Sequence, residues 1–296
     1  MNEHDYHALP SLSHGKLEDL IADPTLFHGR HIARTIPPWE GSDETELGAA
    51  LHKMVLEGSE EYARSVAVWR GGLVEGKRKN DPPHHSMRRG TNAYKAWEAE
   101  QSVHGRRTIV DADAHDQVLA LEMEMLRDPD SRALLTAEGP TEHTLTWSVP
   151  LGDGTEIPCK ARLDKLWTDA DVIVDLKTTR CATLEEHRKQ AIKLGYHRKA
   201  DWYKRGYLAS TGRLARAFLF VSIRTVHTPV VWVWQFDGEV EAVAEIQIDM
   251  ALDDYRTRTL AGDWTQVEQH NVRTLGIRLY EIPESVREEM ERRRQA

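Results

Sequence analysis

Two aspartates and a lysine stand close together on two predicted strands. The stretch 162–179 reads RLDKLWTDADVIVDLKTT, with Asp164 in the first strand and Asp175 and Lys177 in the second. The second run is rich in β-branched residues and alternates, so Asp175 and Lys177 share one face of it. If residues 168–171 form the turn, Asp164 pairs directly with Asp175 across the hairpin.

Two facing carboxylates of this kind favour a bound cation. Their Cβ atoms would lie about 5 Å apart, and like charges at that distance repel, more strongly when they are buried. A divalent ion such as Mg²⁺ removes the conflict, because it takes oxygen ligands and keeps positions for water or a phosphate. Lys177 would then hold a water for attack on phosphorus. The alternative is a solvated edge hairpin, since D-x-K triplets are common.

These residues resemble the core of the PD-(D/E)xK nucleases. An aspartate ending one strand, followed by a hydrophobic run into Asp175-x-Lys177-Thr178-Thr179, is similar to the branch that holds RecB-type and lambda-type exonucleases. Three further segments resemble the RecE-type (exodeoxyribonuclease VIII) nuclease domain: Tyr6–Ser13, Gly48–Glu57 and Gly195–Tyr203. They follow the order of that family, and the resemblance spans residues 6–236.

The resemblance implies a metal site and an activity. It implies that one or two Mg²⁺ or Mn²⁺ ions are held by His52, Asp164, Asp175 and the backbone carbonyl of Leu176, while Lys177 orients the attacking water. Spacing alone would make His52, on the flank of a predicted helix, an ordinary packed or surface histidine. The implied reaction is digestion of double-stranded DNA from its ends, 5′ to 3′, leaving 3′ overhangs for recombination.

Three further residues are secondary candidates. Glu142 begins a predicted strand where related nucleases have a glutamate that assists the metal site, and a surface acid is the alternative. The related pattern has glutamine four residues before Tyr203, whereas this chain has Lys199 there, which leaves the contact with DNA or water open. A lysine could still bind a phosphate, and Tyr203 can hydrogen-bond from the same helical face.

A basic stretch precedes these elements. Lys77–Lys79 and Arg88-Arg89 flank a segment with two prolines and two histidines. Clustered cations near a metal site attract the DNA backbone, and RecE-type proteins have a similar basic run before an aromatic helix. Arg78, Arg88 and Arg89 are therefore candidate DNA contacts. The alternative is a solvated loop, which most charge runs are.

Hydrophobic periodicity places these residues in an α/β fold. We predict a mixed central sheet of about five strands flanked by helices, a restriction-endonuclease-like core with helical elaborations. We expect residues 1–296 to form a single nuclease domain. Its parts would be an N-terminal arm (1–40) that packs around the core, a nuclease core (43–236) and C-terminal helices (237–296).

Composition limits the other possibilities. The 296 residues are 40% hydrophobic and 29% charged, which is typical of a globular protein. A net charge of −9 argues against indiscriminate coating of nucleic acid but allows a local basic groove. Two cysteines, Cys159 and Cys181, are too few for a zinc or iron–sulfur site and suit a reducing, cytoplasmic location. We expect no signal peptide and no membrane span.

The resemblance also implies partners: double-stranded DNA ends, a single-strand annealing protein, and further copies of the chain in a ring around DNA. The sequence itself shows no ring. Two alternatives stay open. One is an endonuclease of the same fold, which would also cut closed circular DNA. The other is a DNA-binding module without catalysis, against which the presence of all four core residues counts.

Overall fold

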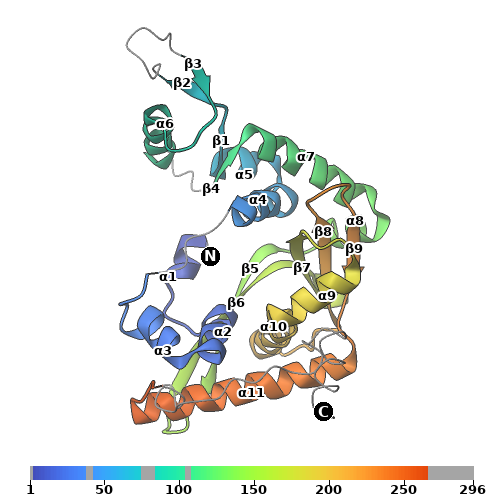
Figure 1. Cartoon of the computed structure of the whole chain (residues 1–296). Coiled ribbons are helices and arrows are strands. Elements are labelled where there is room, and N and C mark those ends of the chain that lie inside the picture. The colour runs from blue at the N-terminus through green and yellow to red at the C-terminus, as the bar shows by residue number, and fades with distance from the viewer. Residues whose placement is uncertain (1–2, 38–42, 75–83, 104–107, 266–296) are drawn as a thin grey trace, which may run out of the picture.

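A five-stranded mixed sheet forms the centre of the molecule (Figure 1). The computed structural model describes residues 3–37, 43–74, 84–103 and 108–265. In sheet order the strands are β5 (Thr141–Pro150), β6 (Glu156–Trp167), β7 (Val172–Thr179), β8 (Ala217–Arg224) and β9 (Val231–Trp234). Strands β7 and β8 are parallel, and all other neighbours are antiparallel. The predicted mixed sheet is confirmed.

The hairpin β6–β7 has the predicted register beside its turn. Three pairs follow it: Lys165 with Val174, Leu166 with Ile173, and Trp167 with Val172. The turn is a short 3₁₀ segment closed by Asp171 in the left-handed conformation, with φ of 53°. The alternation of β7 between two hydrophobic faces follows from this register.

The backbone ladder ends before it reaches the two aspartates. The predicted direct pairing of Asp164 with Asp175 is therefore wrong, because the β6–β7 pairing stops at Lys165. The Asp164 carboxylate instead accepts a hydrogen bond from the backbone N–H of Leu176, at 2.8 Å. A side chain thus takes the place of a strand partner and holds the two strands together at the candidate site.

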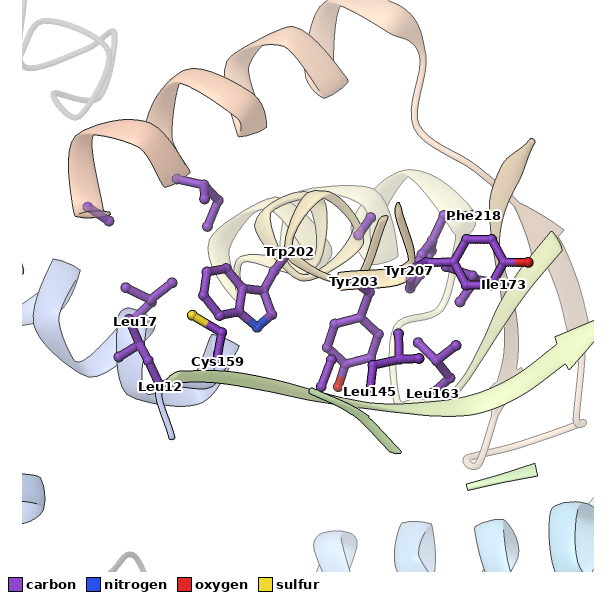
Figure 2. Packing of buried hydrophobic residues seen from close by; sticks show 14 of the residues in the cluster. Leu12, Leu17, Leu145, Cys159, Leu163, Ile173, Trp202, Tyr203, Tyr207 and Phe218 are labelled. Carbon is purple, nitrogen blue, oxygen red and sulfur yellow. The ribbon is translucent and has the colours of Figure 1, made fainter. Parts of the chain in front are cut away.

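Different helices cover the two faces of the sheet. One face is covered by α9 (Leu184–Lys193), α10 (Tyr196–Thr211) and α11 (Gly238–Ala261), and the other by α4 (Asp43–His52), α7 (Ala112–Arg127) and α8 (Pro129–Leu135). Figure 2 shows Trp202 and Tyr207 of α10 packed over the sheet with Leu163 and Ile173. These layers bury β7 on both sides, which fixes the position of its polar residues.

The N-terminal residues pack against the same sheet. Residues 3–8 form the short helix α1 (Glu3–Ala8), which precedes α2 (His14–Ala22), α3 (Pro24–Phe27) and a π-helical turn (His28–Ile32). Ser13 caps α2, because its hydroxyl accepts from the N–H of Lys16. The N–H of Leu12 donates to the carbonyl of Pro158, at 2.8 Å, which attaches this segment to β6.

The remaining elements lie beside α4 and α7. They are a π-helical turn (Lys53–Glu57), α5 (Gly58–Ser65), β1 (Val66–Trp69), β2 (Gly72–Val74), β3 (His84–Ser86), α6 (Asn92–Val103) and β4 (Thr108–Asp111). Three of them, β2, β3 and α6, form a projection from the sheet (Figure 1). Strand β1 pairs in parallel with β4, and β2 pairs with β3. Trp69, Tyr94 and Trp97 pack together at its base. No helix within the described ranges is long and apolar enough to cross a bilayer.

Candidate active site

Strand β7 carries a buried carboxylate with two cationic partners. Asp175 is 1% exposed. Its two oxygens form ion pairs with the ammonium groups of Lys177, two residues along the strand, and Lys199, which comes from α10. A buried carboxylate without partners would be strongly unfavourable. One carboxylate is therefore shared by two ammonium groups. In this arrangement the carboxylate can exchange one cation for another.

The surroundings shift the pKa values of the two lysines in opposite directions. Burial alone would raise the pKa of Asp175, but Lys177 and Lys199 lower it to about 2. Burial lowers the pKa of Lys177, which Asp175 opposes and Lys199 reinforces. Burial would lower the pKa of Lys199 too, but Asp175 raises it well above the ordinary value. Lys177 is therefore the lysine better suited to exchange a proton with water.

Asp164 and His52 meet beside Leu176. Asp164 is 8% exposed, and its Oδ2 lies 3.7 Å from His52 Nδ1. The other ring nitrogen of His52, Nε2, lies 3.0 Å from the carbonyl oxygen of Leu176. The Lys177 ammonium donates to the same oxygen at 3.2 Å. The Leu176 carbonyl thus connects the His52–Asp164 side of the site to the lysine side.

Helix α4 is shaped to bring His52 to this position. The helix that carries His52 changes from α to π geometry immediately after that residue, and such π segments are frequent at functional sites. One turn earlier, a Cβ at Gly48 would lie 3.2 Å from the Thr178 hydroxyl oxygen. Glycine at this position lets the helix approach β7 closely, which is the role that its spacing to His52 suggested.

Glu142 lies beside the site and is not a surface acid. It is the second residue of β5 and has a φ of 48°, and its Oε2 accepts from Arg162 Nε at 2.5 Å. Burial raises the pKa of Glu142, and the charge of Asp164 raises it further, while Arg162 and His52 oppose the change. Glu142, Asp164 and His52 therefore share one electrostatic environment.

The two site lysines also lie over aromatic rings. The Lys199 ammonium is 5.0 Å from the centre of the Tyr203 ring, and the Lys177 ammonium is 5.3 Å from that of Tyr196. Both distances are within the range of cation–π contacts. Burial raises the pKa of Tyr203 above its usual range, so its hydroxyl stays protonated. Lys199 occupies the glutamine position of the related pattern, where it pairs with Asp175 and lies over Tyr203.

The candidate DNA contacts differ from one another. Arg89 donates to Glu46 at 2.7 Å and to the carbonyl of Ile109 at 3.2 Å, so it ties α4 to β4. Arg88 is exposed on the projection, where a DNA backbone could reach it. Arg78 lies outside the described residues. The structure therefore brings neither described arginine into the cluster around Asp175.

Further residues beside Lys177 and Lys199 were not among the predicted site residues. A cavity of about 770 Å³ adjoins Lys177 and Lys199, and its wall includes Tyr6, Lys16 and Lys160. Lys160 belongs to an alternating polar series on β6 with positions 162 and 164, a period-two signal that could have identified it. Tyr6 had no such signal beyond its place in the N-terminal motif.

The donor set suits a divalent metal ion, although its groups are not gathered around one point. Within the described ranges, no three His, Cys, Asp or Glu side chains are close enough to form a metal cluster, since Asp175 faces the two lysines. Asp164, His52 and Leu176 are nevertheless linked by contacts of 2.8 to 3.7 Å. Two carboxylates, an imidazole and a carbonyl oxygen have the chemistry that such an ion requires.

A comparison with protein families decides the classification. The model of a family described as "PDDEXK-like domain of unknown function (DUF3799)" matches residues 39–261. The chain belongs to this PDDEXK-like family. The match includes all five strands of the central sheet, so Asp164, Asp175 and Lys177 lie within the matched range. It supports the superfamily and not the RecE type in particular.

One solved structure shares the fold of nearly the whole chain. A crystal structure from Eubacterium rectale, described as "Putative exonuclease", is similar over 95% of this chain and 97% of its own, with a TM-score of 0.59 and 10% identity. The match to a second crystal structure, of SSO0001, spans 53% of this chain and 68% of that one at 15% identity. Its TM-score of 0.26 is too low to indicate a shared fold. No curated protein sequence matches the chain significantly.

Proposed function

We propose that this PDDEXK-like nuclease is a metal-dependent exodeoxyribonuclease that degrades linear double-stranded DNA from its ends. The observation that carries the proposal is the buried Asp175–Lys177 pair on β7, linked through Leu176 to Asp164 and His52. The family match supports cleavage of a phosphodiester. The exonuclease description of the Eubacterium rectale structure, which shares this fold, supports action from an end.

Lys177 is the residue that we assign to the attacking water. Its ammonium is anchored on the Leu176 carbonyl, it borders the cavity, and burial lowers its pKa. These properties allow it to orient a water and to exchange a proton with it. Lys199 keeps a second positive charge beside the phosphate, where negative charge develops during hydrolysis.

His52, Asp164, Asp175 and the Leu176 carbonyl are the groups that would hold the metal. A divalent ion there, Mg²⁺ or Mn²⁺, would neutralise charge on the phosphate and lower the pKa of water. Asp164 is already fixed by the N–H of Leu176, and His52 is fixed by the Leu176 carbonyl. These contacts hold both side chains in place before any ligand binds.

The finer assignment is to the RecE type. We propose that the enzyme digests 5′ to 3′, leaves 3′ overhangs for recombination in the cytoplasm, and acts as one nuclease domain within a homo-oligomeric ring that cooperates with an annealing protein. The support is the resemblance of three segments to that type: Tyr6–Ser13, Gly48–Glu57 and Gly195–Tyr203.

The proposal is tested on DNA of defined ends. Linear duplex labelled at either 5′ or 3′ ends, and covalently closed circular duplex, are incubated with the protein in Mg²⁺, in Mn²⁺ and in EDTA. We expect loss of the 5′ label first, no cutting of the circle, and no reaction in EDTA. Cutting of the circle would instead indicate an endonuclease, and binding without cleavage of either DNA would indicate a catalytically inactive module.

A further inference from the structure

A short segment near the N-terminus is held against the candidate active site by a buried lysine. This segment, residues 6–12, is called the Tyr6 segment below. Lys160 of β6 is 3% exposed, and its ammonium donates to the backbone carbonyls of Tyr6, at 2.7 Å, and Leu9, at 2.9 Å. A buried ammonium that binds two carbonyls fixes the backbone that carries them.

Further contacts hold the rest of the segment. The Lys16 ammonium donates to the carbonyls of Pro10, at 2.9 Å, and Ser11, at 2.8 Å. The carbonyl of Leu12 accepts from the backbone N–H of Lys160 at 2.8 Å. The ammonium groups of both lysines therefore donate hydrogen bonds to the backbone of one short stretch of chain. In the described part of the molecule, neither of them has a carboxylate partner, so both leave net positive charge beside the cavity.

The Tyr6 side chain points into the charged environment of the site. Its ring lies 4.6 Å from the Lys160 ammonium and 5.8 Å from the Arg162 guanidinium carbon. Burial raises the pKa of Tyr6 to about 12, while Lys199 and Arg162 pull it down and Glu142 pushes it up. The hydroxyl is therefore a protonated donor at neutral pH, and it lies within reach of the charges around Asp175.

The cavity between the Tyr6 segment and α10 has the size and charge for part of a DNA strand. Its volume of about 770 Å³ is in the range of ligand pockets. Tyr6 and Lys160 line it together with Lys177, Lys199 and Tyr203. Lysine ammonium groups and protonated hydroxyls are donors to phosphate oxygens, and the wall offers both kinds.

We propose that the Tyr6 segment is a wall of the active site, in which the Tyr6 hydroxyl binds the sugar–phosphate backbone beside the scissile phosphate and Lys160 holds the segment in position. This inference rests on the proposed nuclease function and adds a substrate-positioning residue to it. It assigns a role to the N-terminal motif, which we had expected only to pack around the core.

The test compares Tyr6→Phe with Tyr62→Phe. The first removes the hydroxyl that faces the cavity and keeps the ring over Lys160. The second removes a buried hydroxyl that bonds His115 on the opposite face of the sheet. We expect Tyr6→Phe to raise the KM for linear duplex about 10-fold, the effect of losing one hydrogen bond to a charged group, with little change in kcat or Tm. Tyr62→Phe should leave KM unchanged.

Lys160→Met tests the positioning role. It should raise KM as well, and it should increase hydrogen exchange at residues 6–12 while the strands of the sheet stay protected. If Lys160→Met does not fold, Tyr6→Phe decides the matter alone. The inference is overturned if Tyr6→Phe has the same KM as the wild type, or if only its kcat falls. DNA cleavage by the wild-type protein would still support the proposed function in either case.

A second readout separates the two proposals. The affinity for a fluorescent linear duplex, measured by anisotropy in EDTA, does not depend on cleavage. Weaker binding by Tyr6→Phe than by wild type and Tyr62→Phe supports the inference, and equal binding overturns it. Absence of cleavage by the wild type with every divalent ion would overturn the proposed function instead.

Discussion

Two ion clusters built on consecutive residues of α10 differ in a way that separates structure from chemistry. Arg198 reaches α2 and binds both carboxylate oxygens of Glu18, at 2.6 and 2.5 Å. Lys199 turns inward to Asp175, which it shares with Lys177. In the outer cluster one guanidinium binds a carboxylate that is 24% exposed. In the inner cluster two ammonium groups share a carboxylate that is 1% exposed.

The difference shows what each cluster can do. A matched fork-to-carboxylate pair satisfies both partners and has little reason to change them. A buried carboxylate between two ammonium groups can release either one and stay neutralised by the other. We therefore regard the outer cluster, Arg198–Glu18, as a connection between α2 and α10. The inner cluster, Asp175–Lys177–Lys199, is the part of the molecule prepared to receive a ligand.

The largest difference between the clusters should appear in DNA cleavage. Lys177→Met should lower the cleavage rate by about 100-fold or more, because it removes the group that handles the water. The fold should persist, since Lys199 still neutralises Asp175. Glu18→Gln, the matched control in the outer cluster, should cleave at the wild-type rate. Undiminished cleavage by Lys177→Met would remove Lys177 from the mechanism.

The next difference concerns stability. Asp175→Asn removes the buried carboxylate and leaves two largely enclosed ammonium groups without it, which should cost about 3–5 kcal/mol of the free energy of unfolding. Glu18→Gln removes a carboxylate from a partly exposed pair and should cost about 1 kcal/mol. Urea denaturation of both variants at neutral pH measures this. Equal losses would mean that Asp175 contributes no more to the free energy of unfolding than Glu18 does.

Metal binding should respond to the second inner cation. Lys199→Gln replaces an ammonium that competes for Asp175 with a neutral amide, so a divalent ion should bind several-fold more tightly. The rise of Tm with added Mn²⁺ gives the midpoint without reference to cleavage. Arg198→Gln, on the adjacent residue, is the control and should leave this midpoint in place. A weaker or unchanged midpoint in Lys199→Gln would contradict the competition.

The smallest effect is the acid sensitivity of the outer cluster. Burial would raise the pKa of Glu18, but hydrogen bonds from Arg198 and His14 lower it to about 2. A lowered pKa means that the pair contributes fully above the ordinary value of 4.5 and is lost as the pH falls from there towards 2. The free energy of unfolding should fall less steeply between pH 4.5 and pH 2.5 in Glu18→Gln than in wild type. Parallel curves would exclude this contribution.

Local pattern was enough to predict the sheet. The alternation of β7 and the turn beside it gave the register of the three pairs from Trp167–Val172 to Lys165–Val174. The acid–lysine spacing on β7 follows directly from strand geometry. These features depend on neighbours in sequence, where periodicity and capping chemistry act.

Contacts between distant segments could not be predicted in the same way. Lys199 reaches Asp175 because α10 packs on the sheet, and a packing geometry has no local signature. Lys160 binds the carbonyl of Tyr6 across 154 positions of the chain, so the N-terminal motif looked like scaffold. Arg89 was a candidate DNA contact because clustered cations near a metal site attract the DNA backbone, but tertiary folding placed Glu46 beside it.

Digestion of linear duplex by wild type, Lys177→Met and Glu18→Gln, side by side in Mg²⁺ and in EDTA, tests the central claim most directly. The account predicts cleavage in Mg²⁺ by wild type and Glu18→Gln, at least about 100-fold slower cleavage by Lys177→Met, and none in EDTA. Equal cleavage by all three proteins, or cleavage that persists in EDTA, would contradict it.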